Sequence, residues 1–249
     1  MSKLFIGTSG WNYPHWQDVF YPKDLSQSKW LEYYARFFNC VELNVTFYRL
    51  VQKKTFQNWH KRTPKDFYFV AKGSRFITHI KKLQQVKEPL NLFIENAIGL
   101  KDKLAAVLWQ LPPSLKKDIK RLESFLRLLK KINIRQVFEF RDITWFDKEI
   151  YLLLKKYNAC LCIAHSGRFP CVKESTADFL YLRFHGGESL YSSDYSDKDL
   201  RGWADFAKQF SAKGKAAGGK NKDIFTFFNN DAYGYALKNA LKFRELLER

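Results

Sequence analysis

The sequence is poor in cysteine, proline and methionine, and no long apolar run occurs in it. Its four cysteines form no CxxC pair and fall far below the density of a disulfide-rich secreted protein, so we expect reduced thiols. Cys160 and Cys162 would share a strand face, but two thiolates without further nearby ligands do not indicate a metal site. We therefore expect no metal and no cofactor.

Targeting and membrane signals are also missing. The opening residues 1–7 contain too few apolar residues for a signal peptide, and no run approaches the ~18 apolar residues of a membrane span. These absences predict a cytoplasmic protein with no membrane partner.

Acidic residues are scarce relative to basic ones: 25 against 43, which gives a formal net charge of +18. Such an excess attracts nucleic acid, acidic lipid or anionic metabolites, and charge alone does not choose among them. Many of the cations fall on the surfaces of expected helices, where a solvated face is the ordinary interpretation. These are Lys116, Lys117, Lys120, Arg121, Lys130 and Lys131.

One basic segment, residues 211–223, has a different composition from the expected helices. It combines glycine, alanine and lysine without apolar periodicity, so we expect a mobile loop there.

Apolar residues make up 46% of the chain and aromatic residues 17%, enough for one large core and a single domain over residues 1–249. Short β-like runs alternate with amphipathic helical stretches from end to end. Strands are expected near Leu4–Thr8, Cys40–Leu43, Phe67–Lys72, Ala105–Gln110, Gln136–Phe140, Ala159–Ile163, Phe179–Phe184 and Ile224–Phe228. Helices are expected near Leu25–Phe38, Thr55–Arg62, Pro89–Leu100, Ile119–Ile132, Asp147–Tyr157, Asp199–Phe210 and Tyr235–Leu247.

Eight strands in this order predict an α/β fold of the closed (β/α)8 TIM-barrel type. An open doubly wound sheet is less favoured, because no Gly-x-Gly-x-x-Gly turn follows the first strand. In a barrel, functional residues gather at the carboxyl ends of the strands.

Polar pairs stand at three of these strand ends: Glu42 with Asn44, Glu139 with Arg141, and Arg183 with His185. Each pair is two residues apart, and a period of two places both members on one face of a strand. Buried ions are costly unless they are paired or solvated, so this arrangement predicts a cleft.

Glu42 and Glu139 are the candidates for acid/base catalysis, because two carboxyl groups in unequal environments can hold different protonation states. In a barrel their strands lie three apart, which would let the two carboxyl groups face each other. A structural ion pair is the alternative for each: Glu139 with Arg141 or Lys72, and Glu42 with Arg183.

The cations Lys72, Arg141 and Arg183 outnumber these two carboxylates, which favours a small anionic substrate, phosphorylated compounds included. The alternative is that they only neutralise the glutamates. His185 shares a face with Arg183 and is a candidate for proton transfer near neutral pH, with a structural histidine as the other interpretation.

Other side chains near the strand ends are suited to binding a ligand. Trp11, Tyr48 and Trp145 could stack on a sugar or a base, although core or rim packing is the favoured interpretation of any single aromatic ring in a chain so rich in them. Amide and hydroxyl side chains could orient a polar ligand or cap loop backbone; these are Thr8, Asn44, Gln110, Asn229 and Asn230.

Six sequence blocks resemble the YecE-like family, domain of unknown function 72. They are GTSGW at 7–11, VELNVTFYR at 41–49, QLPP at 110–113, FEFR at 138–141, YLRFHG at 181–186 and FFNND at 227–231. The resemblance implies a fold similar to a TIM barrel and brings no reaction. The resemblance implies that all the candidate residues except Trp145 occupy motif positions of the family. The basic segment at 211–223 lies outside these motifs.

The leading function is therefore an enzyme, with hydrolase or lyase chemistry, acting on a small anionic substrate. A nucleic-acid binding or processing protein is the second hypothesis, since the net charge suits phosphates and the aromatic rings suit bases. Glycoside hydrolysis by paired carboxylates is a third. A metal-dependent isomerase or nuclease using Glu42, Glu139, His185 or Asp231 is a fourth, although no HxxxH or HExxH spacing supports it.

Overall fold

The computed structural model describes residues 2–216 and 222–249. The chain divides into two compact units. Unit 1 comprises Met1–Val41, Ile163–Cys171 and Asp178–Arg249, and unit 2 comprises Glu42–Cys162 and Val172–Ala177.

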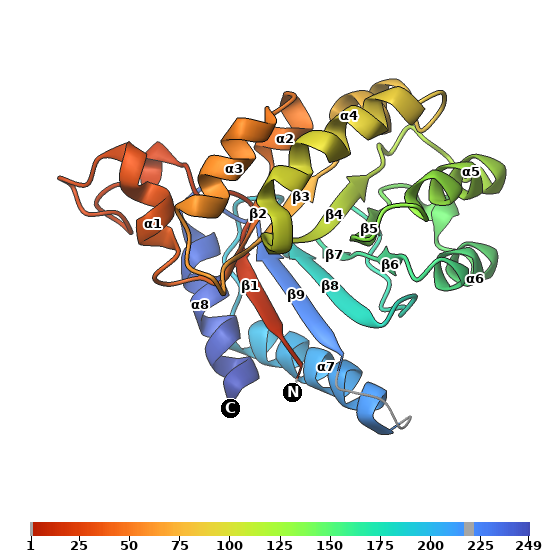
Figure 1. Ribbon diagram of the computed structural model, residues 1–249. Helices are drawn as coiled ribbons and strands as arrows, with labels where there is room; N and C mark the ends of the chain where they lie inside the picture. The colour runs from red at the N-terminus through yellow and green to blue at the C-terminus, as the bar shows by residue number, and fades with distance from the viewer. Residues whose placement is uncertain (1, 217–221) are drawn as a thin grey trace. The chain divides into compact units, whose positions relative to one another are not determined.

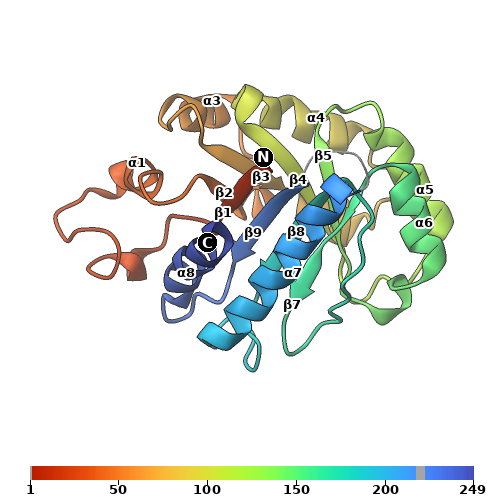
Figure 2. The same cartoon turned by 90° about the horizontal axis from the view of Figure 1, so that it is seen from below.

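Unit 1 contains a parallel four-stranded sheet in the order β1-β9-β8-β7. Its strands are β1 (Leu4–Thr8), β7 (Ile163–His165), β8 (Phe179–Phe184) and β9 (Asp223–Phe228). The helices α7 (Asp197–Ala216) and α8 (Tyr235–Glu248) run along this sheet, as Figures 1 and 2 show.

The strands of unit 1 present two distinct faces. On the face toward the helices, Phe184 stacks on Phe228 at 4.7 Å, and both rings contact Phe243 of α8. On the opposite face, Phe5 stacks on Phe225 at 4.1 Å. Because successive residues alternate between faces, Arg183 shares the face of Phe225 and lies opposite the helices.

The chain that follows β1 forms short helices around buried aromatic rings. They are η1 (Pro14–Trp16), η2 (Gln27–Lys29) and α1 (Trp30–Tyr34). Trp16 and Tyr34 are fully buried and their rings lie parallel, 6.4 Å apart. This aromatic packing holds the loop after β1 against its own unit.

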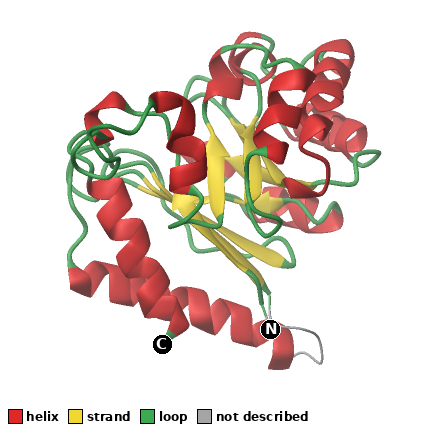
Figure 3. Ribbon diagram, turned by 60° about the vertical axis from the view of Figure 1, so that its left-hand side comes forward, coloured by secondary structure: helices red, strands yellow, loops and turns green. Residues whose placement is uncertain are grey.

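The five-stranded parallel sheet has the order β2-β3-β4-β5-β6. Its strands are β2 (Cys40–Leu43), β3 (Tyr68–Lys72), β4 (Leu104–Gln110), β5 (Arg135–Glu139) and β6 (Cys160–Leu161). The helical segments of unit 2 are α2 (Val45–Tyr48), α3 (Lys53–Lys61), the π-helix η3 (Phe76–Ile80), α4 (Lys87–Ala97), η4 (Ile98–Lys103), α5 (Ile119–Leu129), η5 (Ile143–Trp145) and α6 (Lys148–Lys156). Figure 3 distinguishes these helices from the strands by colour.

The sequence explains where two of these helices begin. Asp118 caps α5 by accepting a hydrogen bond from the backbone N–H of Arg121, and Asp147 caps α6 by accepting from that of Glu149. Along α5, the buried residues Leu122, Phe125, Leu126 and Leu129 recur at helical spacing. Phe125 packs edge-on against Trp109 of β4 with ring centres 5.0 Å apart.

Most of the predicted elements are present within three residues of their expected bounds, and three differ by more. The expected helix at Leu25–Phe38 is limited to Gln27–Tyr34, in two short pieces. The first part of the expected basic loop at 211–223 is helical, because α7 continues to Ala216, in keeping with the high helix propensity of alanine and lysine. Residues 217–221 lie outside the described part of the chain.

The third difference is the strand expected at Ala159–Ile163, which divides in two. β6 pairs with β5, whereas β7 pairs with β8, so the hydrogen-bonded ladder changes partner at Cys162. The described residues therefore form two parallel sheets of a mixed α/β fold, and the predicted closed (β/α)8 barrel is not detected among them. The single domain over residues 1–249 stays a prediction. None of the described helices is long and apolar enough to cross a bilayer.

Candidate functional site

In unit 2, the carboxyl ends of β3, β4 and β5 bring several predicted site residues to one face. Gln110 lies beside Glu139 in the strand register, and Lys72 lies beside Leu108, two residues before Gln110. Arg141 follows Glu139 by two residues and so continues the same face. We call Lys72, Gln110, Glu139 and Arg141 the unit 2 cluster.

Glu139 is the centre of the unit 2 cluster. Its Oε1 accepts one hydrogen bond from Gln110 Nε2 and another from Arg141 Nε, both at 2.9 Å. The Glu139 side chain is 1% exposed and that of Arg141 13%. These two hydrogen bonds offset the free-energy cost of removing the Glu139 carboxylate from water. They also fix the orientation of the carboxylate.

Lys72 lies at the end of β3 with its charge against an aromatic ring. Its Nζ is 4.3 Å from the ring centre of Phe47, and only 6% of the residue is exposed. The Thr46 hydroxyl donates to the Lys72 carbonyl at 2.6 Å, which ties the end of β3 to α2. The side chain is thus a positioned cation rather than a solvated surface lysine.

His79, in the π-helix η3, belongs with this cluster, although it is not among the site residues predicted from the sequence. Burial first, and then the charges of Lys72, Arg141 and Arg75, together lower the pKa of His79 from 6.5 to about 4, against an opposing effect of Glu139. Its Nδ1 lies 2.9 Å from the hydroxyl of Thr78, and its ring contacts Phe47. The only signal in the sequence was its place shortly after a strand that ends in lysine.

Three further predicted residues lie on β2 or just after it. Glu42 is fully buried at the end of β2, and Asn44 is half-buried where α2 begins. Tyr48 is 77% exposed and its ring packs edge-on against Phe47 at 5.0 Å. Phe47 therefore contacts an exposed ring on one side and the Lys72 charge on another.

Trp145 is held in the core of unit 2 rather than presented to a ligand. It is fully buried, its ring stacks on Phe140 at 4.8 Å, and its Nε1 donates to the carbonyl of Leu115 at 2.6 Å. Of the two interpretations of this residue, the structure supports core packing.

In unit 1, Arg183, His185 and Asn229 meet at the carboxyl ends of β8 and β9. The His185 ring lies 3.4 Å from Arg183 Nη1 through Nε2 and 3.1 Å from the Asn229 amide through Nδ1. Arg183 Nη2 also donates to the hydroxyl of Ser9 at 3.5 Å. Arg183 and His185 are both at most 1% exposed.

Both contacts to the His185 ring come from groups that donate hydrogen bonds, Arg183 Nη1 and Asn229 Nδ2. A neutral imidazole has a single acceptor nitrogen, so only one of the two contacts is a hydrogen bond in either neutral tautomer.

Thr8 and Asn230 point away from this group. The Thr8 hydroxyl donates to the carbonyl of Gly10 at 2.6 Å, which shapes the turn after β1. Asn230 Nδ2 donates to Asn239 of α8 at 2.7 Å and to the Ser193 carbonyl at 3.0 Å. Both residues therefore support loops on the helix side of the sheet. Trp11, half-buried after β1, accepts a hydrogen bond at its carbonyl from the Tyr21 hydroxyl.

Asp231 forms a separate polar contact beyond β9. Its carboxylate accepts from Trp16 Nε1 at 2.9 Å and from His15 Nε2 at 2.9 Å. Burial raises the pKa of Asp231 from 3.8 to about 6, against the opposing effects of Trp16 and His15. Within the described residues, no group of three or more histidine, cysteine, aspartate or glutamate side chains is placed to hold a metal ion.

Comparison with known proteins covers nearly the whole chain. A family model described as "Protein of unknown function DUF72" matches residues 5–249. The UPF0759 protein YunF of Bacillus subtilis is 27% identical over 98% of this chain and 95% of its own length. The UPF0759 protein YecE of Escherichia coli K12 is 30% identical over 44% of this chain and 38% of its own.

Solved structures agree with these matches. A DUF72 family protein of Thermotoga maritima is 30% identical, with a TM-score of 0.86 over 99% of this chain and 100% of that one. A DUF72 family protein of Enterococcus faecalis has a TM-score of 0.80 at 21% identity, over 100% of this chain and 96% of that one, and this likeness concerns the fold alone.

Proposed function

Since the chain belongs to the DUF72 family, whose description assigns no reaction, we propose a function from the geometry of the chain itself. The unit 2 cluster binds a small anion through Lys72 and Arg141, and Glu139 transfers a proton on the bound molecule. The reaction is acid/base chemistry on a substrate that carries a phosphate or carboxylate group.

The observation that carries this proposal is the charge balance around His79. Besides burial, which is the largest cause of its lowered pKa, three cations, Lys72, Arg141 and Arg75, and one carboxylate, Glu139, act on the pKa of this histidine. Positive potential over a half-buried imidazole is what an anion-binding position produces. A bound phosphate or carboxylate would partly neutralise these charges.

Glu139 suits the role of proton acceptor because two donors hold its carboxylate at one orientation. Arg141 provides a planar guanidinium, which matches the oxygens of phosphate and carboxylate better than a point charge does. Lys72 adds a second cation, held against Phe47.

The exposed ring of Tyr48 extends this site at its rim. Tyr48 contacts Phe47, which in turn contacts both Lys72 and His79. A substrate with its anionic group between Lys72 and Arg141 could therefore stack a ring or sugar on Tyr48.

An NMR titration of His79 in the presence of inorganic phosphate tests anion binding. Phosphate should raise the pKa of His79 from about 4 toward 6.5, because it offsets the cations that lower it. Arg141→Gln should reduce both the phosphate affinity and this upward shift, and glycerol serves as the neutral control. A His79 pKa that phosphate leaves unchanged would contradict the anion site.

The acid/base role needs a separate test, in which phosphorylated and carboxylated metabolites are screened by thermal shift. For a metabolite that stabilises the wild type, Glu139→Gln should retain binding and lose turnover by about 10²–10⁴-fold. Unchanged turnover in Glu139→Gln would remove Glu139 from the mechanism while leaving the anion site intact.

A further inference from the structure

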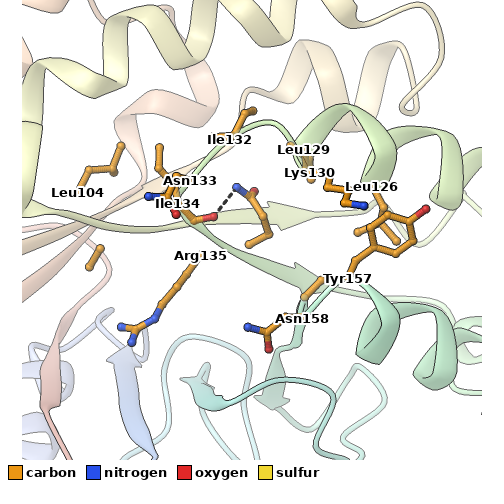
Figure 4. A pocket seen from close by; sticks show the side chains of 13 residues that line it. Leu104, Leu126, Leu129, Lys130, Ile132, Asn133, Ile134, Arg135, Tyr157 and Asn158 are labelled. Atoms are coloured by element: carbon orange, nitrogen blue, oxygen red, sulfur yellow. Dashed lines mark hydrogen bonds between the residues drawn. The ribbon is translucent and has the colours of Figure 1, made fainter.

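A pocket of about 400 Å³ opens at the amino ends of β4, β5 and β6 in unit 2 (Figure 4). Arg135, the first residue of β5, lines it, whereas Glu139 ends the same strand. Four residues of strand separate their Cα atoms by about 13 Å. The pocket and the unit 2 cluster are therefore at opposite ends of β5.

Apolar side chains form the inner wall of the pocket. Ile132 and Ile134, between α5 and β5, are half-buried and line the pocket, whereas the lining residues Leu126 and Leu129 are at most 2% exposed. The ring of Tyr157 adds an aromatic surface, and its hydroxyl donates to Glu123 at 3.3 Å, which holds the ring in place. A wall of this kind favours a ligand with an apolar body.

The polar groups of the lining are cationic or neutral. Lys130 and Arg135 both line the pocket, with Asn133 and Asn158 beside them. None of the described residues that line it is an aspartate or a glutamate. Arg135 belongs to the strand face of Glu139, opposite α5, so Lys130 is the cation on the α5 side. Its charge offsets the weak negative end of the α5 dipole, part of which is already satisfied because the Leu126 carbonyl accepts from Lys130 N.

The floor of the pocket is held by hydrogen bonds before any ligand arrives. Gln136 Oε1 accepts from Trp109 Nε1 at 2.7 Å, and Gln136 Nε2 donates to the Ile134 carbonyl at 2.8 Å, the bond drawn in Figure 4. A pre-formed lining lowers the ordering cost of binding.

We propose that this pocket is a second binding site, which takes a small amphipathic anion. The ligand has an apolar ring or short acyl body against Ile132, Ile134 and Tyr157, and one carboxylate, sulfonate or phosphate group near Lys130. The volume lies within the usual range for small-molecule sites, about 300–1,000 Å³.

The test uses 8-anilinonaphthalene-1-sulfonate, whose fluorescence rises in an apolar site, and its neutral counterpart N-phenyl-1-naphthylamine, which lacks the sulfonate. The wild-type protein should bind the sulfonate at a saturable site, and the neutral probe about fivefold more weakly, as expected for the loss of an ion pair. Equal affinity for both probes would overturn the anionic part of the proposal.

Three variants locate the site. Lys130→Gln should weaken sulfonate binding about fivefold, whereas Lys131→Gln, an exposed lysine outside the lining, should leave it unchanged. Ala105→Leu should fill the pocket and abolish saturable binding, with its fold checked by circular dichroism. Equal effects of the two lysine changes, or saturable binding that survives Ala105→Leu, would overturn the proposal.

An Arg141→Gln protein distinguishes this pocket from the proposed anion site on β3–β5. Sulfonate binding that Arg141→Gln leaves intact supports a separate site at the amino ends. Sulfonate binding that disappears in Arg141→Gln assigns the probe to the unit 2 cluster and overturns the second site.

Discussion

Glu139 and Arg141, two residues apart at the end of β5, form a hydrogen-bonded ion pair with Nε and Oε1 separated by 2.9 Å. Both side chains are largely removed from water. The Arg141 guanidinium therefore has two roles: it holds the Glu139 carboxylate in place, and it is the candidate ligand for an anion.

Breaking this pair should destabilise the fold. Glu139→Gln keeps the side-chain volume but leaves the Arg141 charge without its carboxylate, and we expect a loss of about 3 kcal/mol in the free energy of unfolding. Urea denaturation measures this loss. In the double variant Glu139→Gln/Arg141→Gln the loss should be smaller than the sum of the single losses. Additive losses would show that the two charges do not stabilise each other.

The stability should depend on pH through His79. Its pKa in the folded protein, about 4, lies below the ordinary 6.5. The unfolded chain therefore binds the proton more tightly, and the contribution of His79 to stability should rise between pH 4 and pH 6.5 and be constant above. The difference in unfolding free energy between wild type and His79→Gln isolates it from Asp231, whose raised pKa acts in the opposite direction. A difference that does not change with pH would contradict the assignment.

Gly73 directly follows β3 and cannot carry a side chain without displacing Trp109. A Cβ at this position would lie 2.2 Å from the Trp109 ring. Gly73→Ala should therefore cost about 1–3 kcal/mol of stability. Gly202→Ala in α7 is the control: nothing lies within 4 Å of the new Cβ, so it should stabilise the protein by about 0.5–1 kcal/mol. Thermal denaturation of both variants measures the contrast, and a neutral Gly73→Ala would disprove the clash.

Two aromatic residues of the predicted site should behave differently. Trp145→Phe keeps the stacking on Phe140 but removes the donor to the Leu115 carbonyl, so a loss of about 1–3 kcal/mol is expected. Tyr48→Ala changes a side chain that is 77% exposed and should alter stability by at most about 0.5 kcal/mol. Urea denaturation compares them, and a large loss in Tyr48→Ala would mean that this ring is structural.

Local patterns in the sequence determined most of the elements and the residues that share a strand face. The bounds of β1, β2 and β8 were predicted without error, because an apolar run bounded by polar or turn residues reports directly on a buried strand. The proximity of Glu139 and Arg141 followed from the same period of two, which needs no knowledge of the rest of the chain.

Tertiary structure alone decided which polar residues face the site. Asn229 and Asn230 are adjacent, yet Asn229 contacts His185 and Asn230 contacts Asn239 of α8, and the sequence pattern does not say which partner each side chain meets. His79 joined the unit 2 cluster through the π-helix after β3, and the ladder changed partner at Cys162. Such features depend on contacts between residues that are far apart in the sequence. The spacing of residues within a short segment carries no information about the energies of those contacts.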